Sequence, residues 1–244
     1  MSPKHVVSCS FGKDSIATIL LALEHGEPLD EAVYCEVMFD NSTSGEVPEH
    51  QAFIYQAAIP ALEKLGVPVR VLRSEKTYTS VFMGKVTRGP KKGMIRSFPV
   101  CGKCYVQRDC KMHPIRQYQK TLPSNTVQYI GIAKNEPQRL ARLGGNQVSL
   151  LEKYGYTEDD AKQLCKQAGL LSPVYEFTDR GGCWFCPNAK LSELRHLYDH
   201  HPDLWQKMMR LQIVPGKVTE KFNRNQTFAD IDAMFREQDL QAAA

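Results

Sequence analysis

The chain has 244 residues, of which 42% are apolar and 24% charged, with a net charge of +4 at pH 7 and a pI near 8.5. These values are typical of a soluble globular protein with one large domain, or one domain and a smaller second one. The net charge by itself is too small to indicate nucleic acid. No stretch approaches the roughly twenty apolar residues of a membrane span, and the start MSPKHVV lacks the features of a signal peptide. The sequence therefore predicts a cytoplasmic protein without a membrane partner.

The first half of the chain alternates apolar strands with amphipathic helices. The pattern predicts strands at 5–10, 31–39, 67–73 and 126–133, and helices at 14–25 and 49–65. Strands separated by helices form βαβ units with right-handed crossovers, and hence a parallel sheet. We expect an α/β fold with a Rossmann-like parallel sheet in a domain of residues 1–150.

A long basic segment separates the third and fourth predicted strands, and the chain after the fourth strand is predicted to be mainly helical. Residues 85–104 (KVTRGPKKGMIRSFPVCGKC) form a long basic segment that predicts a loop. After about residue 150 the strand signal fades, and helices are predicted at 157–169, at 190–212 with an interruption at Pro202, and at 227–238. Residues 151–244 are therefore predicted to be a small, mainly helical C-terminal region. The histidines in HLYDHHPDLW are interpreted as a helix end rather than a metal site.

The hexapeptide SFGKDS at residues 10–15 connects the first strand to the first helix. It is not a kinase-type P-loop, because no glycine precedes Gly12 and Lys13 is followed by Asp14. The first βα turn of an open parallel sheet nevertheless meets phosphate. Gly12 can adopt a positive φ and lets the backbone approach an anion closely. The N–H groups that open the helix would then face its oxygens. A tight turn capped by Asp14 is the alternative.

Several segments, in this order, resemble the PP-loop adenine-nucleotide alpha-hydrolase superfamily, in particular its phosphoadenosine phosphosulfate (PAPS) reductase-like family of phage and prophage type. SFGKDS resembles the SGGKDS-type PP-loop, and VMFDNSTSGEVPEH an acidic strand end followed by a Pro-Glu signature. CKMHPIRQY resembles a Lys-x-x-Pro segment, and GIAKNEPQRLARL a Gly-Ile-x-x-x-Glu-x-x-Arg segment. SPVYEFTDRGGCWFCPNAKLSELRHLYDHHPDLW is similar to the cysteine-bearing tail of that family.

This resemblance implies an adenine nucleotide as ligand, either ATP or the sulfonucleotides PAPS and APS, together with Mg²⁺. It implies catalytic roles for Lys13, Asp14 and Asp40, although Asp40 is equally well explained as part of a strand-end turn with Asn41. The implied nucleotide-binding residues are Ser10, Phe11, Gly12, Lys13, Asp14, Ser15, Asp40, Lys111, Gly131 and Arg139.

The chain departs from the family pattern in three places. Phe11 stands where the loop has its first glycine, and Ala133 and Lys134 stand where the family often has an arginine. Sulfonucleotide reductases carry a nucleophilic cysteine near the C-terminus, whereas no cysteine follows Cys186 here and no two cysteines are adjacent. The resemblance therefore supports the fold and nucleotide binding better than it supports reduction of PAPS.

The eight cysteines fall into two classes. Cys9, Cys35 and Cys165 are isolated in apolar segments, which is typical of small buried side chains. Four of the other five form two C-x-x-C pairs that could supply four thiolates to one metal. The predicted ligands are Cys101, Cys104, Cys183 and Cys186, with Cys110 as a substitute. The spacing fits zinc or an iron–sulfur cluster, and the family resemblance favours a 4Fe–4S cluster over structural zinc.

Basic residues are concentrated between residues 85 and 116, where Asp109 is the exception. Such a stretch could follow a phosphodiester backbone, steer a charged nucleotide, or be an ordinary solvated surface. The expected function is that of a PP-loop enzyme that binds ATP, adenylylates a substrate with release of pyrophosphate, and supports sulfur transfer. The acceptor would be tRNA or DNA, and the donor a protein or sulfide. The alternatives are a PAPS or APS reductase and a non-catalytic nucleotide-binding regulator.

Overall fold

The computed structural model describes residues 3–100 and 104–243. Two compact units are present, and each is assembled from three separate segments. The first comprises residues 1–36, 47–73 and 114–181, and the second residues 37–46, 74–113 and 182–244. This organisation differs from the expected division at residue 150, because the segments that follow the second and third strands leave the sheet and fold with the C-terminal helices.

The first unit contains a five-stranded parallel sheet in the order β3-β2-β1-β4-β5. The strands are β1 (His5–Cys9), β2 (Glu31–Glu36), β3 (Val69–Arg73), β4 (Val127–Ile130) and β5 (Gln147–Val148). The predicted α/β class and parallel sheet are confirmed, with all four expected strands present. The fifth strand was not predicted, since two residues carry no readable alternation.

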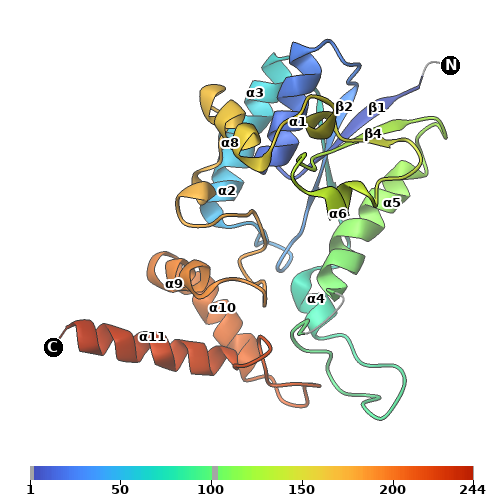
Figure 1. Ribbon diagram of the computed structural model, residues 1–244. Coiled ribbons are helices and arrows are strands. Elements are labelled where there is room, and N and C mark those ends of the chain that lie inside the picture. The colour runs from blue at the N-terminus through green and yellow to red at the C-terminus, as the bar shows by residue number, and fades with distance from the viewer. Residues whose placement is uncertain (1–2, 101–103, 244) are drawn as a thin grey trace. The chain divides into compact units, whose positions relative to one another are not determined.

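Helices flank this sheet, and Figure 1 shows α1, α3 and α8 grouped on one side of it. The right-handed crossovers from β1 to β2 and from β2 to β3 place α1 and α3 on the same face. The helices of this unit, including the π-helix η1 and the 3-10 helix η3, are α1 (Lys13–Glu24), α2 (Pro48–Ala52), η1 (Phe53–Ala58), α3 (Ile59–Lys64), α5 (His113–Gln119), α6 (Pro137–Leu140), α7 (Leu150–Lys153), α8 (Glu158–Gln167) and η3 (Pro173–Glu176).

Local signals explain where α8 begins and ends. Thr157 caps its N-terminus in a capping box with Asp160, and Gly169 follows the helix with φ +66°. Buried side chains of α8 join those of α1 in the hydrophobic core of the unit. Cys9, Cys35 and Cys165 are all buried, as their apolar surroundings predicted.

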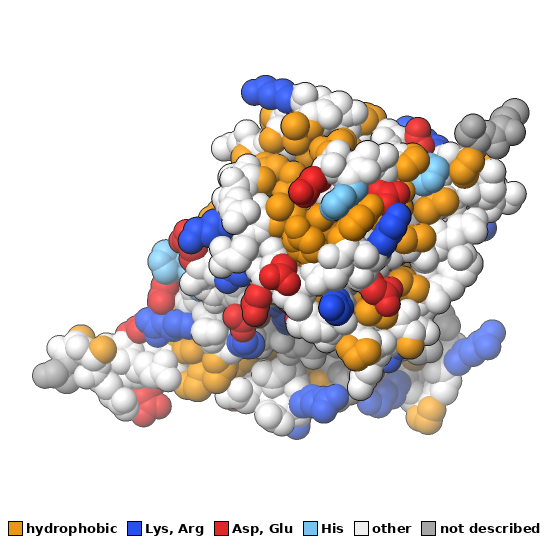
Figure 2. Space-filling model, turned by 45° about the horizontal axis from the view of Figure 1, so that its top comes forward, with side chains coloured by type: hydrophobic (Ala, Val, Ile, Leu, Met, Phe, Trp, Pro, Cys, Tyr) orange, Lys and Arg blue, Asp and Glu red, His pale blue; other side chains and the backbone are white. Residues whose placement is uncertain are grey.

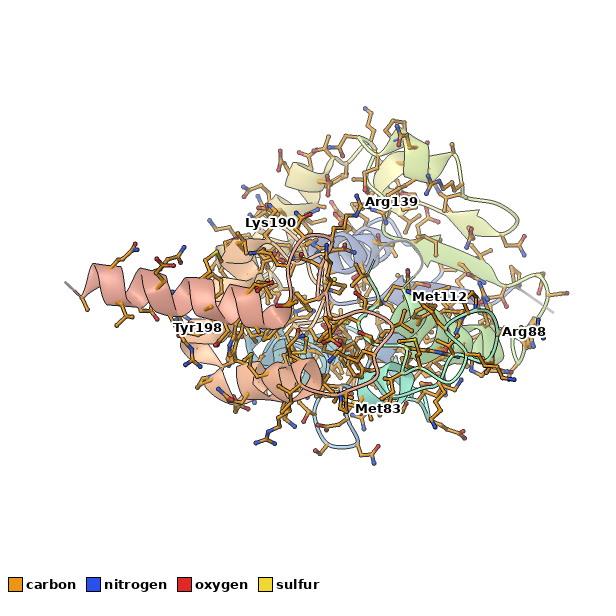
Figure 3. All side chains as sticks on the ribbon, turned by 90° about the horizontal axis from the view of Figure 1, so that it is seen from below. Met83, Arg88, Met112, Arg139, Lys190 and Tyr198 are labelled. Carbon is orange, nitrogen blue, oxygen red and sulfur yellow. The ribbon has the colours of Figure 1, made fainter. Side chains whose placement is uncertain are left out.

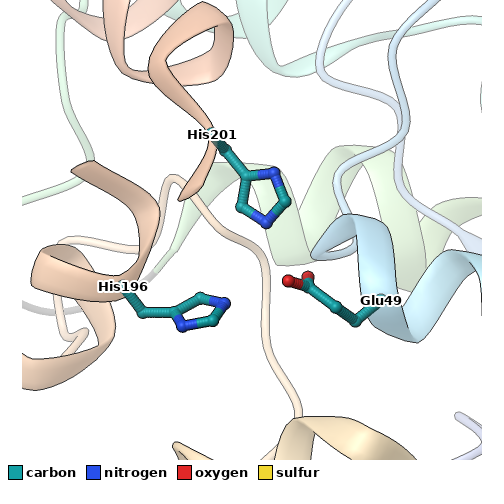
Figure 4. A group of neighbouring side chains, drawn as sticks. All are labelled: Glu49, His196 and His201. Carbon is teal, nitrogen blue, oxygen red and sulfur yellow. The ribbon is translucent and has the colours of Figure 1, made fainter. Parts of the chain in front are cut away.

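The second unit is mainly helical around an aromatic core. Its helices are α4 (Tyr78–Phe82), the π-helix η2 (Gln107–Met112), α9 (Leu191–His200), α10 (Pro202–Gln212) and α11 (Phe228–Ala242). The interruption expected at Pro202 is present as the junction between α9 and α10. His196 lies on α9 and His201 at this junction, with ring centroids 5.8 Å apart (Figure 4). Among the described residues, no helix is long and apolar enough to cross a bilayer.

Candidate functional site

The loop that follows β1 lies at the point where the strand order of the sheet reverses. The chain leaves β1 toward β2 on one side, and β4 pairs with β1 on the other. Open parallel sheets bind ligands at the carboxyl ends of such strands. Gly131 directly follows β4, and a Cβ there would lie 2.8 Å from the carbonyl carbon of Asp14. Glycine is therefore required at 131 for the end of β4 to approach the start of α1.

The backbone conformation of the loop differs between Phe11 and Gly12. Gly12 has φ −75°, so it does not use the positive φ that a glycine can adopt. The left-handed conformation occurs instead at Phe11, with φ +57°. The Phe11 ring is fully buried and packs edge-on against Tyr34 at 5.1 Å. Burial of this large ring offsets the cost of an uncommon backbone conformation, and only the backbone of Phe11 remains available to a ligand.

Some of the backbone N–H groups of the loop already have hydrogen-bond partners. The N–H of Lys13 donates to the Tyr175 hydroxyl at 2.8 Å. The Ser15 hydroxyl accepts from the N–H of Ser10 at 3.2 Å and donates to the carbonyl of Gly12 at 3.0 Å, so it shapes the loop. Within the described part of the chain, the N–H groups of Gly12 and Asp14 have no hydrogen-bond partner. These two groups, at the N-terminus of α1, are available to an anion.

Lys13 is the cation of the loop, and two carboxylates hold it. Its Nζ lies 2.8 Å from Asp14 and 3.0 Å from Glu158 at the start of α8. Burial opposes the charge on Lys13, but the hydrogen bonds to both carboxylates outweigh it and raise its pKa above the ordinary value. Burial also raises the pKa of Asp14, against the effect of Lys13. A nucleotide phosphate would therefore compete with Glu158 for this ammonium group.

Buried side chains support the loop from behind. His50 contacts the Ser172 hydroxyl through Nδ1 at 2.8 Å and the carbonyl of Ser10 through Nε2 at 3.2 Å. The Cys165 thiol donates to the carbonyl of Lys13 at 3.1 Å, and burial raises the pKa of this thiol to about 12. The loop is thus held from α2, α8 and the segment before η3. Sequence reasoning missed Glu158, Tyr175 and His50, because only the fold brings them to SFGKDS.

Arg139, a predicted phosphate ligand, lies in the first unit on α6. Its guanidinium pairs with Glu136 at 2.5 Å. The other oxygen of Glu136 accepts the N–H of Ala133 at 3.1 Å, which closes the turn after β4. The Gly-Ile-x-x-x-Glu-x-x-Arg segment is therefore held together by contacts among its own residues. The Arg139 guanidinium is already paired with Glu136.

Asp40, predicted to be catalytic, lies in the second unit and holds a turn. Its carboxylate accepts the N–H groups of Ser42 at 2.9 Å and Thr43 at 2.7 Å, and pairs with Lys207 of α10 at 2.7 Å. Partial burial alone would raise the pKa of Asp40, but these hydrogen bonds outweigh burial and hold the pKa well below its usual range. These contacts of the Asp40 carboxylate stabilise the turn and its link to α10. They agree with the strand-end turn that the sequence analysis gave as the alternative to a catalytic role.

This ion pair predicts a pH-dependent contribution to stability. Because folding lowers the pKa of Asp40, the contribution is fully present above the unfolded-state pKa of about 4 and is lost as the pH falls toward the folded-state pKa. We expect Asp40→Asn to lower the free energy of unfolding by about 1 kcal/mol at neutral pH, with a smaller difference in acid. Urea denaturation at pH 7 and pH 3 measures this, and an equal difference at both values would contradict it.

The described cysteines of the two C-x-x-C pairs all belong to the second unit. The N–H of Cys186 donates to the carbonyl of Cys183 at 3.0 Å and closes that turn. The Sγ of Cys104 accepts the N–H of Gln107 at 3.4 Å. Burial is the largest cause that raises the pKa of Cys183, and the charge of Glu46 is the next. The charges of Cys186 and Cys104 also raise it. Cys186 and Cys104 are therefore neighbours of the Cys183 thiol.

The two residues inside CWFC anchor that turn. Trp184 donates its backbone N–H to Gly45 at 3.1 Å and its indole N–H to Ser44 at 2.9 Å. A Cβ on Gly45 would lie 2.5 Å from the carbonyl oxygen of Val37, so only glycine fits there. The ring of Phe185 stacks on Tyr78 with centroids 4.1 Å apart. CWFC is therefore a fixed turn in an aromatic core.

The Tyr78 hydroxyl provides a test of whether these residues fit a metal–thiolate group. Tyr78 is 1% exposed, and its buried hydroxyl oxygen has no hydrogen-bond partner among the residues that the structure describes. Burial raises the pKa of this phenol, and the charges of Cys104, Cys186 and Cys183 raise it further. A buried O–H without an acceptor costs about 1–3 kcal/mol. Thiolate or sulfide sulfur would supply that acceptor, so the residues fit the predicted metal centre.

The other residues of the metal prediction lie as follows. Cys101 is outside the described residues. Cys110 is fully buried on η2. Lys111, predicted to be a phosphate ligand, also lies on η2, and its charge lowers the pKa of Cys183 against the effect of burial. Lys111 is thus a neighbour of the thiols in the second unit.

The basic segment forms a hairpin instead of an open loop. Lys85 pairs with Ile95 in an antiparallel bridge, and Ile95 bridges in parallel to Lys217. This pairing adds Lys221 and Arg224 to the same part of the second unit, which sequence reasoning missed because more than a hundred residues separate them from the hairpin. Figure 2 shows Lys and Arg side chains without Asp or Glu at its lower right, where this segment lies. Arg88 is at the outer end of the hairpin (Figure 3).

Comparisons with known proteins returned one similar structure. No protein-family model matches the chain, and no curated protein matches it either. Among solved structures, the chain is similar to the U34-tRNA thiolase NcsA from Methanococcus maripaludis with its [4Fe-4S] cluster. The identity is 14%, the TM-score is 0.42, and the match covers 88% of this chain and 74% of that one.

Proposed function

We propose that the protein is a PP-loop enzyme that binds ATP, adenylylates an oxygen atom of its substrate with release of pyrophosphate, and supports transfer of sulfur to the activated position. The observation that carries this proposal is the loop at the β1/β4 reversal. There the N–H groups of Gly12 and Asp14 open α1 beside the ammonium group of Lys13. Such an arrangement stabilises negative charge on phosphate oxygens.

The chemistry follows from this charge distribution. A substrate oxygen would bond to the α-phosphorus of ATP and lose its proton to water, while the bond to the bridging oxygen breaks and pyrophosphate leaves. Lys13 and the loop amides would balance the charge that develops on the leaving group. A sulfur nucleophile would then bond to the activated carbon, and AMP would leave with the substrate oxygen. Asp14 would hold Mg²⁺, which a carboxylate beside phosphates commonly does.

The metal centre of this proposal is held by Cys104, Cys183 and Cys186, with Cys101 as the fourth ligand. A [4Fe–4S] cluster bound there would supply sulfur chemistry, whereas zinc would be structural. None of the seven described cysteines forms a disulfide, and we place the protein in the cytoplasm.

The proposal is tested by its products. Purified protein incubated with ATP, Mg²⁺, sulfide and a tRNA or DNA substrate should release AMP and pyrophosphate in equal amounts, and sulfur should appear in the acceptor. Release of ADP and phosphate would overturn it. Release of sulfite from PAPS with thioredoxin would identify the reductase alternative instead, and nucleotide binding without either product would identify a regulator.

A nucleic-acid acceptor is favoured by the basic hairpin face, which we define as the exposed side chains Lys85, Arg88, Lys91, Lys92, Lys221 and Arg224. Within residues 3–100 and 104–243, no carboxylate forms an ion pair with any of them. Unpaired cations of this kind bind phosphodiester backbones through release of counterions.

We expect the triple variant Arg88→Ala, Lys91→Ala, Lys92→Ala to weaken RNA or DNA binding and to lower the slope of log affinity against log salt by about 2–3. The same measurement on Lys64→Ala, Lys120→Ala, Lys166→Ala, a triple variant of exposed lysines in the first unit, provides the control. Equal salt slopes for both variants would exclude the basic hairpin face as the nucleic-acid surface.

A further inference from the structure

Tyr78 is the first residue of α4, and its position is fixed from several sides. Its backbone N–H donates to the carbonyl of Met38 at 2.8 Å. Its ring stacks on Phe185 and on Phe39, with centroid distances of 4.1 Å and 5.3 Å. The hydroxyl therefore cannot turn toward water without disrupting this aromatic core.

The ring of Tyr78 stacks on Phe185, which lies between Cys183 and Cys186 in the chain. Burial, and then the charges of Cys104, Cys186 and Cys183, raise the pKa of the Tyr78 hydroxyl, and within residues 3–100 and 104–243 this buried hydroxyl has no hydrogen-bond partner. Buried polar groups are almost always hydrogen-bonded in native proteins. A tyrosine retained in such surroundings, where phenylalanine would fill the same space without the buried polar atom, indicates an acceptor that belongs to the functional state.

We propose that the Tyr78 hydroxyl donates a hydrogen bond to a sulfur atom of the metal centre, either a cysteine thiolate or a bridging sulfide, and thereby sets its stability and reduction potential. The inference rests on the metal site of the proposed function. Sulfur in a metal–thiolate centre carries negative charge and accepts hydrogen bonds, and such bonds raise the reduction potential because they stabilise the more negative reduced state. Tyr78 is in this sense a positioning residue that acts through the metal ligands.

The test uses Tyr78→Phe, which removes only the hydroxyl, in the full-length protein prepared without oxygen. We expect the variant to keep the fold, to release metal to a chelator about tenfold faster than the wild type, and to have a lower midpoint potential if the metal is a cluster. Tyr129→Phe on β4 is the matched control, because Tyr129 is also buried but belongs to the first unit. It should leave both quantities unchanged.

The outcomes separate this inference from the proposed function. A wild-type protein that binds no metal would remove the metal site itself. A metal-bearing wild type whose release rate and potential are unchanged in Tyr78→Phe would overturn the role of Tyr78 alone. If Tyr78→Phe fails to retain metal during purification, titration with Co²⁺ decides: weaker thiolate–cobalt absorption than in Tyr129→Phe supports the hydrogen bond, and equal absorption overturns it.

Discussion

Replacement of Lys13 by alanine is expected to lower the rate of pyrophosphate release from ATP by about two to three orders of magnitude. Lys13 is the cation of the loop that follows β1, and its Nζ lies among the acidic groups of that loop and α8. Charge that develops on the leaving pyrophosphate would be stabilised there in a largely buried position, where an ammonium group acts more strongly than in water. Asp14→Ala should have a comparable effect through loss of Mg²⁺. A coupled assay for pyrophosphate measures both variants.

Two controls make this result specific. Lys166→Ala removes an exposed lysine of α8 in the same unit and should leave pyrophosphate release unchanged. Metal content should stay at the wild-type level in Lys13→Ala, because the thiols belong to the other unit. Retained pyrophosphate release in both Lys13→Ala and Asp14→Ala would remove the loop from the mechanism.

Replacement of Cys183 by alanine is expected to abolish stable metal binding. Cys183 lies in the fixed CWFC turn, with its thiol close enough to those of Cys104 and Cys186 for each to affect its pKa. A four-ligand site that loses one thiolate loses most of its affinity, because the remaining ligands no longer offset the cost of removing the ion from water. Metal analysis and absorbance of protein purified without oxygen measure the loss.

Cys35→Ala is the matched control for this variant. Cys35 is a buried cysteine, but it lies on β2 in the first unit, so metal content should not change. Iron at about four atoms per chain in the wild type would identify the cluster, and a single zinc would identify the structural alternative. A Cys183→Ala variant with wild-type metal content would show that CWFC is not part of the centre.

The pattern of apolar residues was enough to predict the sheet and most long helices. The strands at His5–Cys9, Glu31–Glu36 and Val69–Arg73 and the helix capped by Thr157 all lie where local signals placed them. These features depend on short-range periodicity and capping, which a single sequence records directly. The short elements, such as β5, lack that signal, because tertiary pairing alone stabilises them.

Part of the candidate site could likewise be predicted from the sequence, and part became visible only in the folded structure. SFGKDS and the two C-x-x-C pairs could be recognised from residue type and spacing, since phosphate loops and thiolate ligands require particular side chains at fixed intervals. The sequence could not place the positive φ at Phe11 instead of Gly12, because that choice depends on a buried pocket for the ring beside Tyr34. Glu158, His50 and Tyr78 likewise became visible only when folding brought distant segments together.

The amino-acid sequence by itself determined the α/β class, and it indicated the turn after β1 and the C-x-x-C pairs as candidate binding residues, because these features depend on residue type and local spacing. The tertiary structure alone decided which groups are already engaged: the ammonium of Lys13 by Glu158, and the carboxylate of Asp40 by Lys207. Among the described residues, it also left the buried Tyr78 hydroxyl without a hydrogen-bond partner. The physical reason is that hydrogen bonding and desolvation depend on distances between residues far apart in the chain, and only the folded backbone fixes these distances.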